Sequence, residues 1–466
     1  MLVRLLSRRN LLYDHFRRLA TSVAATPDVP LSPAPPAKER AKRKPEKIRE
    51  LEQHFPAKTL ERFPASLLKR GSQNTERFYL ASPDAAKDVA KLVTADLPEG
   101  TLLAEVNPGA GCLTKELLKS KKVSRLLLIE YDDWFREGLR QFEGPRVELK
   151  SGDFNGQWKQ IYLDSLDRGG RLEKLLEGLP KRRWTEEGVN FRLFSIVATI
   201  RFFKTLLYSV VNQKGLYGLG RSELVLIVPP LLYVHLTCTK DAGYKLYRSG
   251  SVLFQLFFEH KFLGKIKRKD FLPWPANAGT RKYRTQHWQL GLVEADEWYV
   301  MRIVPRADLH EHCLPDNLRL LAFFVTQNMI SRRNRVIPAL ERWIPHCGAR
   351  LILNQNYVPA KQQTHPPPKP TCSSSEDPPT FRRSSSPLCS NEFLPQMNIF
   401  TEFGELTPSQ VLTLFNEFIN WPEFRQSPFL QTMEQQQAKS PNPFSGGREI
   451  DEPDEDDELE EGKTGS

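Results

Sequence analysis

Cysteine is scarce in this chain: six occur in 466 residues, with no CxxC pair and no cysteine-histidine cluster at metal-ligand spacing. This pattern argues against a disulfide framework and against a bound metal, and it fits a reducing compartment. The chain also lacks an apolar run of about 18 residues, so we expect no membrane insertion. The cysteines are Cys112, Cys238, Cys313, Cys347, Cys372 and Cys389.

Acidic residues are outnumbered except at the carboxyl terminus. The formal net charge is +11, from 67 lysines and arginines against 56 aspartates and glutamates. Residues 448–466 hold ten carboxylates and two cations, so the rest of the chain carries about +19. A body this basic attracts phosphate backbones because binding releases condensed counterions. A charge that only maintains solubility is the alternative interpretation.

The first twenty residues contain five arginines and a single acid, Asp14. On a helix, one face carries Leu2, Leu5, Leu12, Phe16 and Leu19, and another carries Arg4, Arg8 and Arg18. Arginine-rich amphipathic leaders are typical of mitochondrial transit peptides, although an ordinary basic surface helix has the same pattern. We interpret residues 1–40 as a transit peptide and the start of a disordered linker, and we expect the protein in the mitochondrial matrix.

The body of the chain begins after a proline- and lysine-rich linker, which we assign to residues 41–74. Between 75 and 308, short apolar runs alternate with helical stretches, which indicates an open α/β sheet covered on both faces. The runs are TLLAEV (101–106), SRLLLIE (124–130), RVELKSGD (146–153), FRLFSIVATI (191–200), ELVLIVPP (223–230) and WYVMRIVP (298–305).

A smaller helical carboxyl-terminal domain is expected over residues 309–432. Helical spacing of apolar residues starts at Leu318, Pro338 begins or kinks a second helix, and Thr407 caps a third with Pro408 in its first turn. Residues 359–396 are too polar and proline-rich to pack, which predicts a disordered insertion. Residues 433–466 are expected to form a disordered acidic tail.

Polar residues at three successive strand ends outline a candidate cofactor crevice. The first strand ends at Glu105 before the glycine-rich turn Asn107–Gly111, Glu130 closes the second strand, and Asp153 closes the third. Glycine lets the backbone approach a ligand, and a carboxylate about twenty residues later can accept ribose hydroxyls. A capping Glu130 and a turn Asp153 are the separate alternatives for these two acids.

The runs RFYLASPDAAKDVAKLV (77–93), EVNPGAG, LIEYD and SGDF resemble the rRNA adenine dimethyltransferases. In detail they are similar to the mitochondrial transcription factor B branch of that family, particularly its second paralogue. The likeness covers about 75–430 with a gap at the proline-rich insertion. It continues through WYVMRIVPRADLH (298–310), SRRNRVIPALERWIP (331–345) and LTPSQVLTLFNEFI (406–419).

The resemblance implies a Rossmann-like methyltransferase domain that binds S-adenosyl-L-methionine. By the resemblance, Leu80 would line the cofactor pocket, together with Glu105 at the end of the first strand. Asn107 and Gly109 would face the methionine moiety, with Glu130 at the ribose. Asp153 would face the adenine ring.

The chain departs from the family's pattern at the fourth strand. There the family has an Asn-Leu/Ile-Pro-aromatic motif, which orients the target amine and stacks the flipped base. This chain has Val197-Ala198-Thr199-Ile200-Arg201 instead, with Phe202 and Phe203 following. Asn107 also replaces the family's first glycine in the turn. We therefore expect weak or lost methyl transfer and assign no catalytic residue.

Two basic clusters are candidate nucleic-acid contacts. Cations interleaved with aromatic residues are typical of proteins that bind single strands or melted duplexes, although any one of these residues is more simply a solvated surface charge. The candidates are Lys267, Lys269, Arg268, Arg332, Arg333 and Arg335.

The resemblance, together with the substituted fourth-strand motif, implies a mitochondrial transcription initiation factor that would work with the mitochondrial RNA polymerase on promoter DNA at the nucleoid. The alternative is an active dimethyltransferase of adjacent adenosines in mitochondrial small-subunit rRNA. A ribosome-assembly factor that binds rRNA without modifying it is a third possibility.

Overall fold

The computed structural model describes residues 46–69, 77–242, 246–274, 296–353, 394 and 397–439. The predicted transit peptide, almost all of the 359–396 insertion and the acidic part of the tail lie outside these residues. No helix of the described part is long and apolar enough to cross a membrane. Nor does this part contain a metal-binding group of three or more His, Cys, Asp or Glu residues.

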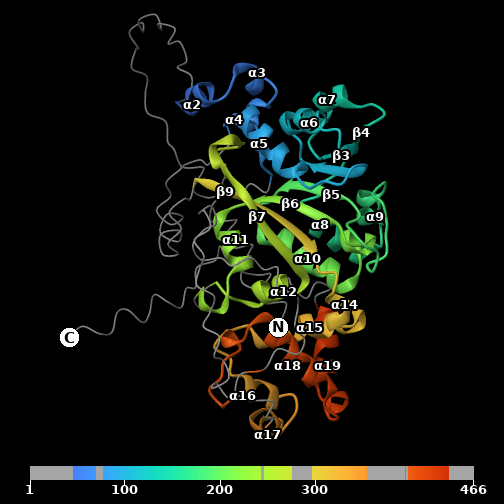
Figure 1. The fold of residues 1–466 in the computed structure, drawn as a ribbon, viewed down its shortest axis with the longest axis vertical. Coiled ribbons are helices and arrows are strands. Elements are labelled where there is room, and N and C mark those ends of the chain that lie inside the picture. Colours follow the sequence, from blue (N-terminus) through green and yellow to red (C-terminus); the bar gives the residue numbers. More distant parts are fainter. Residues whose placement is uncertain are drawn as a thin grey trace, which may run out of the picture. The chain divides into compact units, whose positions relative to one another are not determined.

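A seven-stranded sheet forms the centre of the fold, in the order β4-β3-β2-β5-β6-β9-β7 (Figure 1). The first five strands in this order are parallel, and β9 is antiparallel to both of its neighbours. The predicted α/β fold is therefore confirmed. The strands are β2 (Thr101–Val106), β3 (Val123–Glu130), β4 (Val147–Ser151), β5 (Arg192–Ile196), β6 (Glu223–Val228), β7 (Phe258–Lys267) and β9 (Glu297–Pro305).

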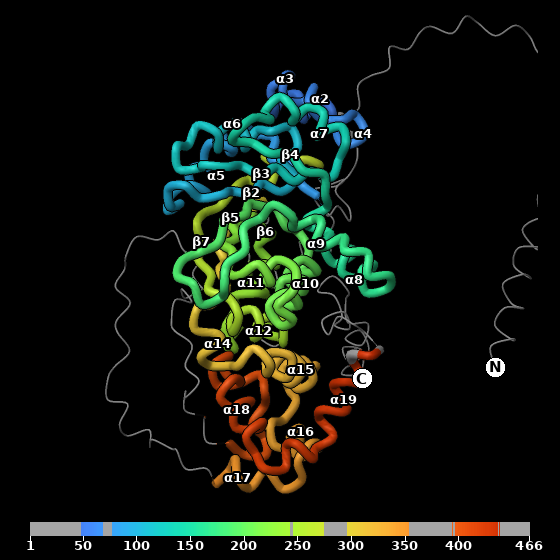
Figure 2. Tube along the Cα trace, turned by 90° about the vertical axis from the view of Figure 1, so that its right-hand side faces the viewer, coloured from blue at the N-terminus to red at the C-terminus, as the bar shows by residue number. Residues whose placement is uncertain are grey.

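Chain order reverses between β2 and β5, which makes the carboxyl ends of these parallel strands the expected ligand edge. Helices cover both faces of the sheet because its central strands are apolar on both sides (Figures 1 and 2). One face packs against α5 (Pro83–Thr94), α6 (Cys112–Leu117) and α7 (Asp133–Leu139). The other packs against α9 (Arg171–Leu176), α10 (Ile200–Asn212), α11 (Pro230–Thr237) and α12 (Ser249–Phe257), and α8 (Gln157–Asp167) precedes α9.

The linker predicted for residues 41–74 is wrong over 46–69. This segment forms α2 (Glu46–His54), α3 (Ala57–Leu60) and α4 (Ala65–Lys69). Leu51 and Phe55 are buried, and the Phe63 ring lies 5.5 Å from that of Phe135 on α7. The widely spaced apolar residues of this segment pack against the α5–α7 layer, although charged residues lie between them along the chain.

The short strand β1 (Tyr79–Leu80) pairs antiparallel with β8 (Phe271–Leu272), outside the main sheet. The Ala81 amide also donates to the Asp270 carbonyl at 2.9 Å. Short 3-10 turns lie at Arg140–Phe142, Gly215–Leu219, Lys240–Ala242, Arg268–Asp270, Pro315–Asn317, Phe403–Glu405 and Phe424–Gln426.

The carboxyl-terminal helices share one hydrophobic core with α12 and the α10 face of the sheet. Phe324 lies at the centre of this shared core and contacts the rings of Phe415 and Phe418. Tyr247 Oη donates to the Leu406 carbonyl at 2.8 Å, which links the two parts directly. The helices are α14 (Leu309–His312), α15 (Leu318–Asn328), α16 (Val336–Glu341), α17 (Gly348–Leu353), α18 (Pro408–Asn420) and α19 (Phe429–Lys439).

Thr407 caps α18 by accepting from the Gln410 amide at 3.2 Å, and Pro408 occupies the first turn, as predicted. Pro338 lies in the first turn of α16, which also agrees with the sequence. The tail predicted from residue 433 is wrong at its start, because α19 continues to Lys439.

Candidate cofactor site and nucleic-acid surface

The turn after β2 has a backbone that few residues tolerate. Asn107 and Gly109 have φ values of +52° and +57°, in the left-handed region. A Cβ at Gly109 would lie 2.6 Å from Cδ1 of Tyr79, so only glycine fits beneath that ring. Asparagine is among the few residues with a side chain that adopt this region readily, which explains how Asn107 can replace a glycine.

Glu130 ties the end of β3 to this turn. Its Oε2 accepts from the Gly109 amide and its Oε1 from the Asp132 amide, each at 3.0 Å. Burial raises the pKa of Glu130 to about 7, although the backbone hydrogen bonds oppose the shift. Each oxygen keeps a lone pair, so the carboxylate can still accept two vicinal hydroxyls.

Glu105 is a second buried carboxyl beside the turn. Thr114 Oγ1 on α6 donates to Glu105 Oε2 at 2.7 Å. Burial raises the pKa of Glu105 to about 8, and the nearby Glu130 charge adds to the shift. A cationic ligand group at this position would favour the ionised carboxylate because it compensates the buried charge.

Asp153 follows β4 and is buried. Its Oδ1 accepts from the Gly156 amide at 3.0 Å, and its Oδ2 accepts from Arg77 Nη2 at 2.6 Å. The Arg77 guanidinium also lies 4.0 Å from the centroid of the Tyr131 ring, which is 52% exposed. Sequence reasoning missed Arg77 and Tyr131; only the position of Tyr131 directly after Glu130 could have indicated a contact.

The residues present fit S-adenosyl-L-methionine. Asn107 is buried, and neither its Nδ2 nor its Oδ1 has a hydrogen-bond partner. Buried side-chain amides normally have hydrogen-bond partners, so a polar ligand group at the turn would supply the partners that Asn107 lacks. Leu80 is buried on β1, beside the Tyr79 ring that covers Gly109. The cofactor roles of these residues nevertheless remain predictions.

Among the described residues at the carboxyl end of β5, the side-chain amide of Asn155 is already engaged and the two phenylalanine rings are buried. Val197 is buried, and Thr199 precedes α10 without a capping side-chain hydrogen bond. The amide of Asn155 reaches this strand, but its Nδ2 donates to the Ile196 carbonyl and its Oδ1 accepts from Ser195 Oγ. Phe202 and Phe203 are each 1% exposed and belong to the core, so neither ring can stack on a base.

Only part of the first basic cluster faces solvent. Lys267 and Lys269 are exposed, while Arg268 is half-buried. Arg268 donates to the carbonyls of Phe271 at 3.0 Å and Pro273 at 2.7 Å, and it lies 4.7 Å from the Phe78 ring. Arg268 therefore holds the β8 segment together, which makes it a poor candidate for contacting phosphate.

The second basic cluster also contains one half-buried arginine and two exposed arginines. Arg332 Nη2 donates to the carbonyls of Lys240 and Gly404, both at 3.2 Å, so this side chain links the 3-10 turns Lys240–Ala242 and Phe403–Glu405. Arg332 is therefore a poor candidate for contacting nucleic acid, although the sequence placed it among the candidates. Arg333 and Arg335 are exposed, and Arg335 lies 5.1 Å from the Phe400 ring.

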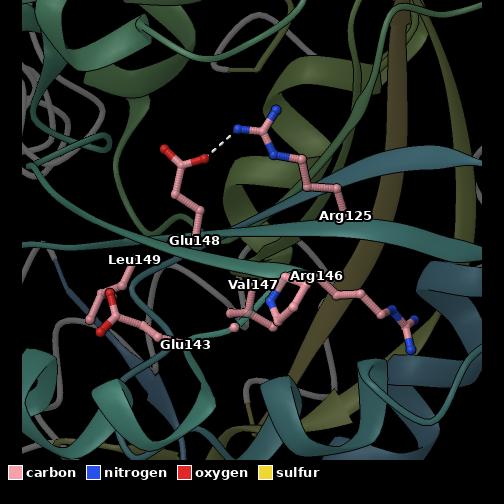
Figure 3. A pocket seen from close by; sticks show the side chains of 8 residues that line it. Arg125, Glu143, Arg146, Val147, Glu148 and Leu149 are labelled. Carbon is pink, nitrogen blue, oxygen red and sulfur yellow. Dashed lines mark hydrogen bonds and ion pairs between the residues drawn. The ribbon is translucent and has the colours of Figure 1, made fainter.

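A separate pocket of about 400 Å³ lies near the amino ends of β3 and β4, away from Glu130 and Asp153. Its wall contains an ion pair between Arg125 and Glu148 (Figure 3). Arg146, also in its lining, donates to the Val123 carbonyl at 2.6 Å. This pocket does not belong to the cofactor edge.

Comparison with known proteins gives the family. The model for ribosomal RNA adenine dimethylase matches residues 73–358. Mitochondrial dimethyladenosine transferase 2 of Drosophila melanogaster is 37% identical over 381 residues, covering 80% of this chain and 82% of that protein. The Mus musculus protein of the same name is 23% identical over 301 residues, covering 60% and 72%. The 23S rRNA methyltransferase ErmE aligns with 15% identity and a TM-score of 0.38, covering 73% of this chain and 99% of ErmE.

The matched residues include the three acids at the strand ends and the glycine-rich turn after β2. The cofactor of this methyltransferase family is S-adenosyl-L-methionine, in agreement with the prediction from the sequence. The chain therefore belongs to the ribosomal RNA adenine dimethylase family and is homologous to proteins named mitochondrial dimethyladenosine transferase 2.

Proposed function

We propose that this protein is a mitochondrial transcription initiation factor that helps the mitochondrial RNA polymerase to melt promoters. In this proposal the dimethyltransferase scaffold retains weak methyl transfer or none. The main support for weak or lost methyl transfer comes from the carboxyl end of β5. There the Asn155 side-chain amide is hydrogen-bonded to the strand, and Phe202 and Phe203 are buried in the core.

Methyl transfer to a base depends on positioning more than on any single bond. An adenine amine must be presented to the cofactor, and the base must be held outside its stack. Loss of a stacking ring alone weakens binding of the base by about 1–3 kcal/mol. Val197, Ala198 and Thr199 supply neither a ring nor a free amide, so the target amine is left without orientation.

The cofactor edge can still bind its ligand. S-adenosyl-L-methionine supplies an electrophilic methyl group when bound. Glu130 would accept the ribose hydroxyls, and Asp153 would accept the adenine amino group. Glu105 and Asn107 would face the charged methionine end. These residues hold and orient the ligand without touching a target base.

The exposed cations suit the phosphate backbone of an opened promoter. Lys267 is the last residue of β7 and Lys269 lies between β7 and β8, while Arg333 and Arg335 lie before α16. The resemblance to the mitochondrial transcription factor B branch supports promoter DNA and the polymerase as partners. The arginine-rich leader and the mitochondrial names of the relatives support the matrix, at the nucleoid.

The second candidate is an active dimethyltransferase of adjacent adenosines in mitochondrial small-subunit rRNA. The arrangement of Glu130 and Asp153 at neighbouring strand ends favours it, since this edge keeps its acceptors. The two candidate functions predict opposite effects of the same substitutions on transcription and on rRNA dimethylation.

The test compares two variants and a matched control in three assays: DNA binding, promoter-dependent RNA synthesis and rRNA dimethylation. Lys267→Ala with Lys269→Ala should weaken DNA binding, lower promoter-dependent RNA synthesis, and reduce the salt slope of binding by about 0.7–0.9 per lost phosphate contact. Asp153→Asn should leave RNA synthesis near the wild-type level. Lys87→Ala with Lys91→Ala removes the same charge from α5 as a matched control. Loss of rRNA dimethylation in Asp153→Asn, with transcription indifferent to every variant, would instead establish the enzyme.

A further inference from the structure

The side chain of Arg77 lies among the groups expected to hold the adenine ring. Its Nη2 donates to Asp153 Oδ2 at 2.6 Å, and its guanidinium stacks 4.0 Å from the centroid of Tyr131. Asp153 is 6% exposed, so this ion pair satisfies a carboxylate that would otherwise be buried without a cation. Burial is the largest single effect on the Arg77 pKa and lowers it, but the hydrogen bond and the charge interaction with Asp153, together with smaller contributions from Tyr79 and Tyr131, raise the arginine pKa overall.

A guanidinium and the amino edge of adenine make the same two kinds of contact. Both are flat and can lie on an aromatic ring, and both present N–H donors to a carboxylate. Tyr131 directly follows the predicted ribose acceptor Glu130, so its ring is placed to stack on a base attached to that ribose. Arg77 and adenine therefore compete for Tyr131 and for Asp153.

We propose that Arg77 is a built-in competitor that occupies the adenine subsite, so that an adenosyl ligand binds only after the guanidinium leaves. The backbone beside Arg77 is held by the β1–β8 pairing and by the Phe78 ring, 4.9 Å from Trp298. The displacement is therefore a side-chain rotation. The buried Nε of Arg77 has no partner, so contacts through Nη2 and the ring face hold the guanidinium in place.

Calorimetry on the full chain tests this competition, with S-adenosylmethionine, S-adenosylhomocysteine and adenosine as separate probes. Arg77→Gln removes the ion pair and the cation but keeps a polar side chain. It should tighten binding of all three probes by about tenfold, the equivalent of one charge-assisted hydrogen bond. Arg125→Gln, which breaks the ion pair with Glu148 in the separate pocket, should leave all three affinities unchanged (Figure 3).

A double-mutant cycle separates competition from a general change in the pocket. In an Asp153→Asn background the ion pair is already broken, so the gain from Arg77→Gln should fall well below tenfold. Thermal melts of each variant establish that it is folded before binding is measured. Unchanged or weaker binding in folded Arg77→Gln overturns the proposal, as does an equal gain in the Asp153→Asn background.

The inference rests on the cofactor assignment and not on the promoter role. Failure of both the wild type and Arg77→Gln to bind any of the three probes would also overturn it. That outcome would leave the promoter assay to decide the proposed function separately.

Discussion

Arg332→Ala should loosen the carboxyl-terminal helices, although Arg332 belongs to a cluster that the sequence assigns to nucleic acid. Its guanidinium donates two hydrogen bonds, to the carbonyls of Lys240 and Gly404. Bonds from a charged donor contribute about 1.5–3 kcal/mol each. Both bonds are long, at 3.2 Å, and come from one half-buried side chain, so we take about 1–1.5 kcal/mol for each and expect a total of about 2–3 kcal/mol. Arg333→Ala, the exposed neighbour, should change stability by less than about 0.5 kcal/mol.

Amide hydrogen exchange measures this effect where it arises. The Gly404 amide donates to the Arg332 carbonyl at 2.8 Å, and the Phe403 amide donates to the Asn334 carbonyl at 2.9 Å. In Arg332→Ala these two amides should exchange about 30- to 160-fold faster, the equivalent of 2–3 kcal/mol. Equal exchange in Arg332→Ala and Arg333→Ala would refute the structural role and return Arg332 to the candidate DNA contacts.

Three further predictions concern the cofactor edge and the tail. Burial raises the pKa of Glu130 from 4.5 to about 7 and that of Glu105 from 4.5 to about 8. The folded state therefore retains protons that the unfolded state has lost, and the free energy of unfolding should fall as the pH rises from about 4.5 to about 8. Urea titrations at several pH values should show that the free energy of unfolding falls less steeply with pH in Glu105→Gln than in the wild type. An identical dependence on pH would contradict the raised pKa of Glu105. Glu130→Ala should weaken S-adenosylmethionine binding by about 1–3 kcal/mol in calorimetry, and undiminished affinity would exclude the ribose role. Deleting residues 449–466 should tighten non-specific DNA binding, most at low salt; affinity equal to that of the intact chain at every ionic strength would assign the tail another role.

The sheet could be predicted from the sequence because its buried strands are short apolar runs separated by turn residues. The run 101–106 matches β2 in full. The run 191–200 does not match β5, because the chain leaves the sheet after Ile196 and α10 begins at Ile200 within the same apolar stretch. Strand β7 was missed because its half-exposed, lysine-containing pattern resembles a surface cluster.

The strand-end acids of the candidate site could be predicted because their order along the chain matches their order in the sheet. Glu130 ends β3, and Asp153 follows β4. The contact between Arg77 and Asp153 could not be predicted, since it joins residues 76 positions apart through a side-chain rotamer. For the same reason, the inward orientation of Arg268 and Arg332 could not be distinguished from that of Lys267 and Arg333.

Promoter opening tests the central claim most directly. A mitochondrial promoter carrying 2-aminopurine near the start site would be mixed with the mitochondrial RNA polymerase, with or without the full chain. We predict that fluorescence rises only when both proteins are present, and equally for wild type and Asp153→Asn, because opening does not use the adenine acceptor. No rise with the wild-type protein, alongside dimethylation of small-subunit rRNA by the same preparation, would contradict the account.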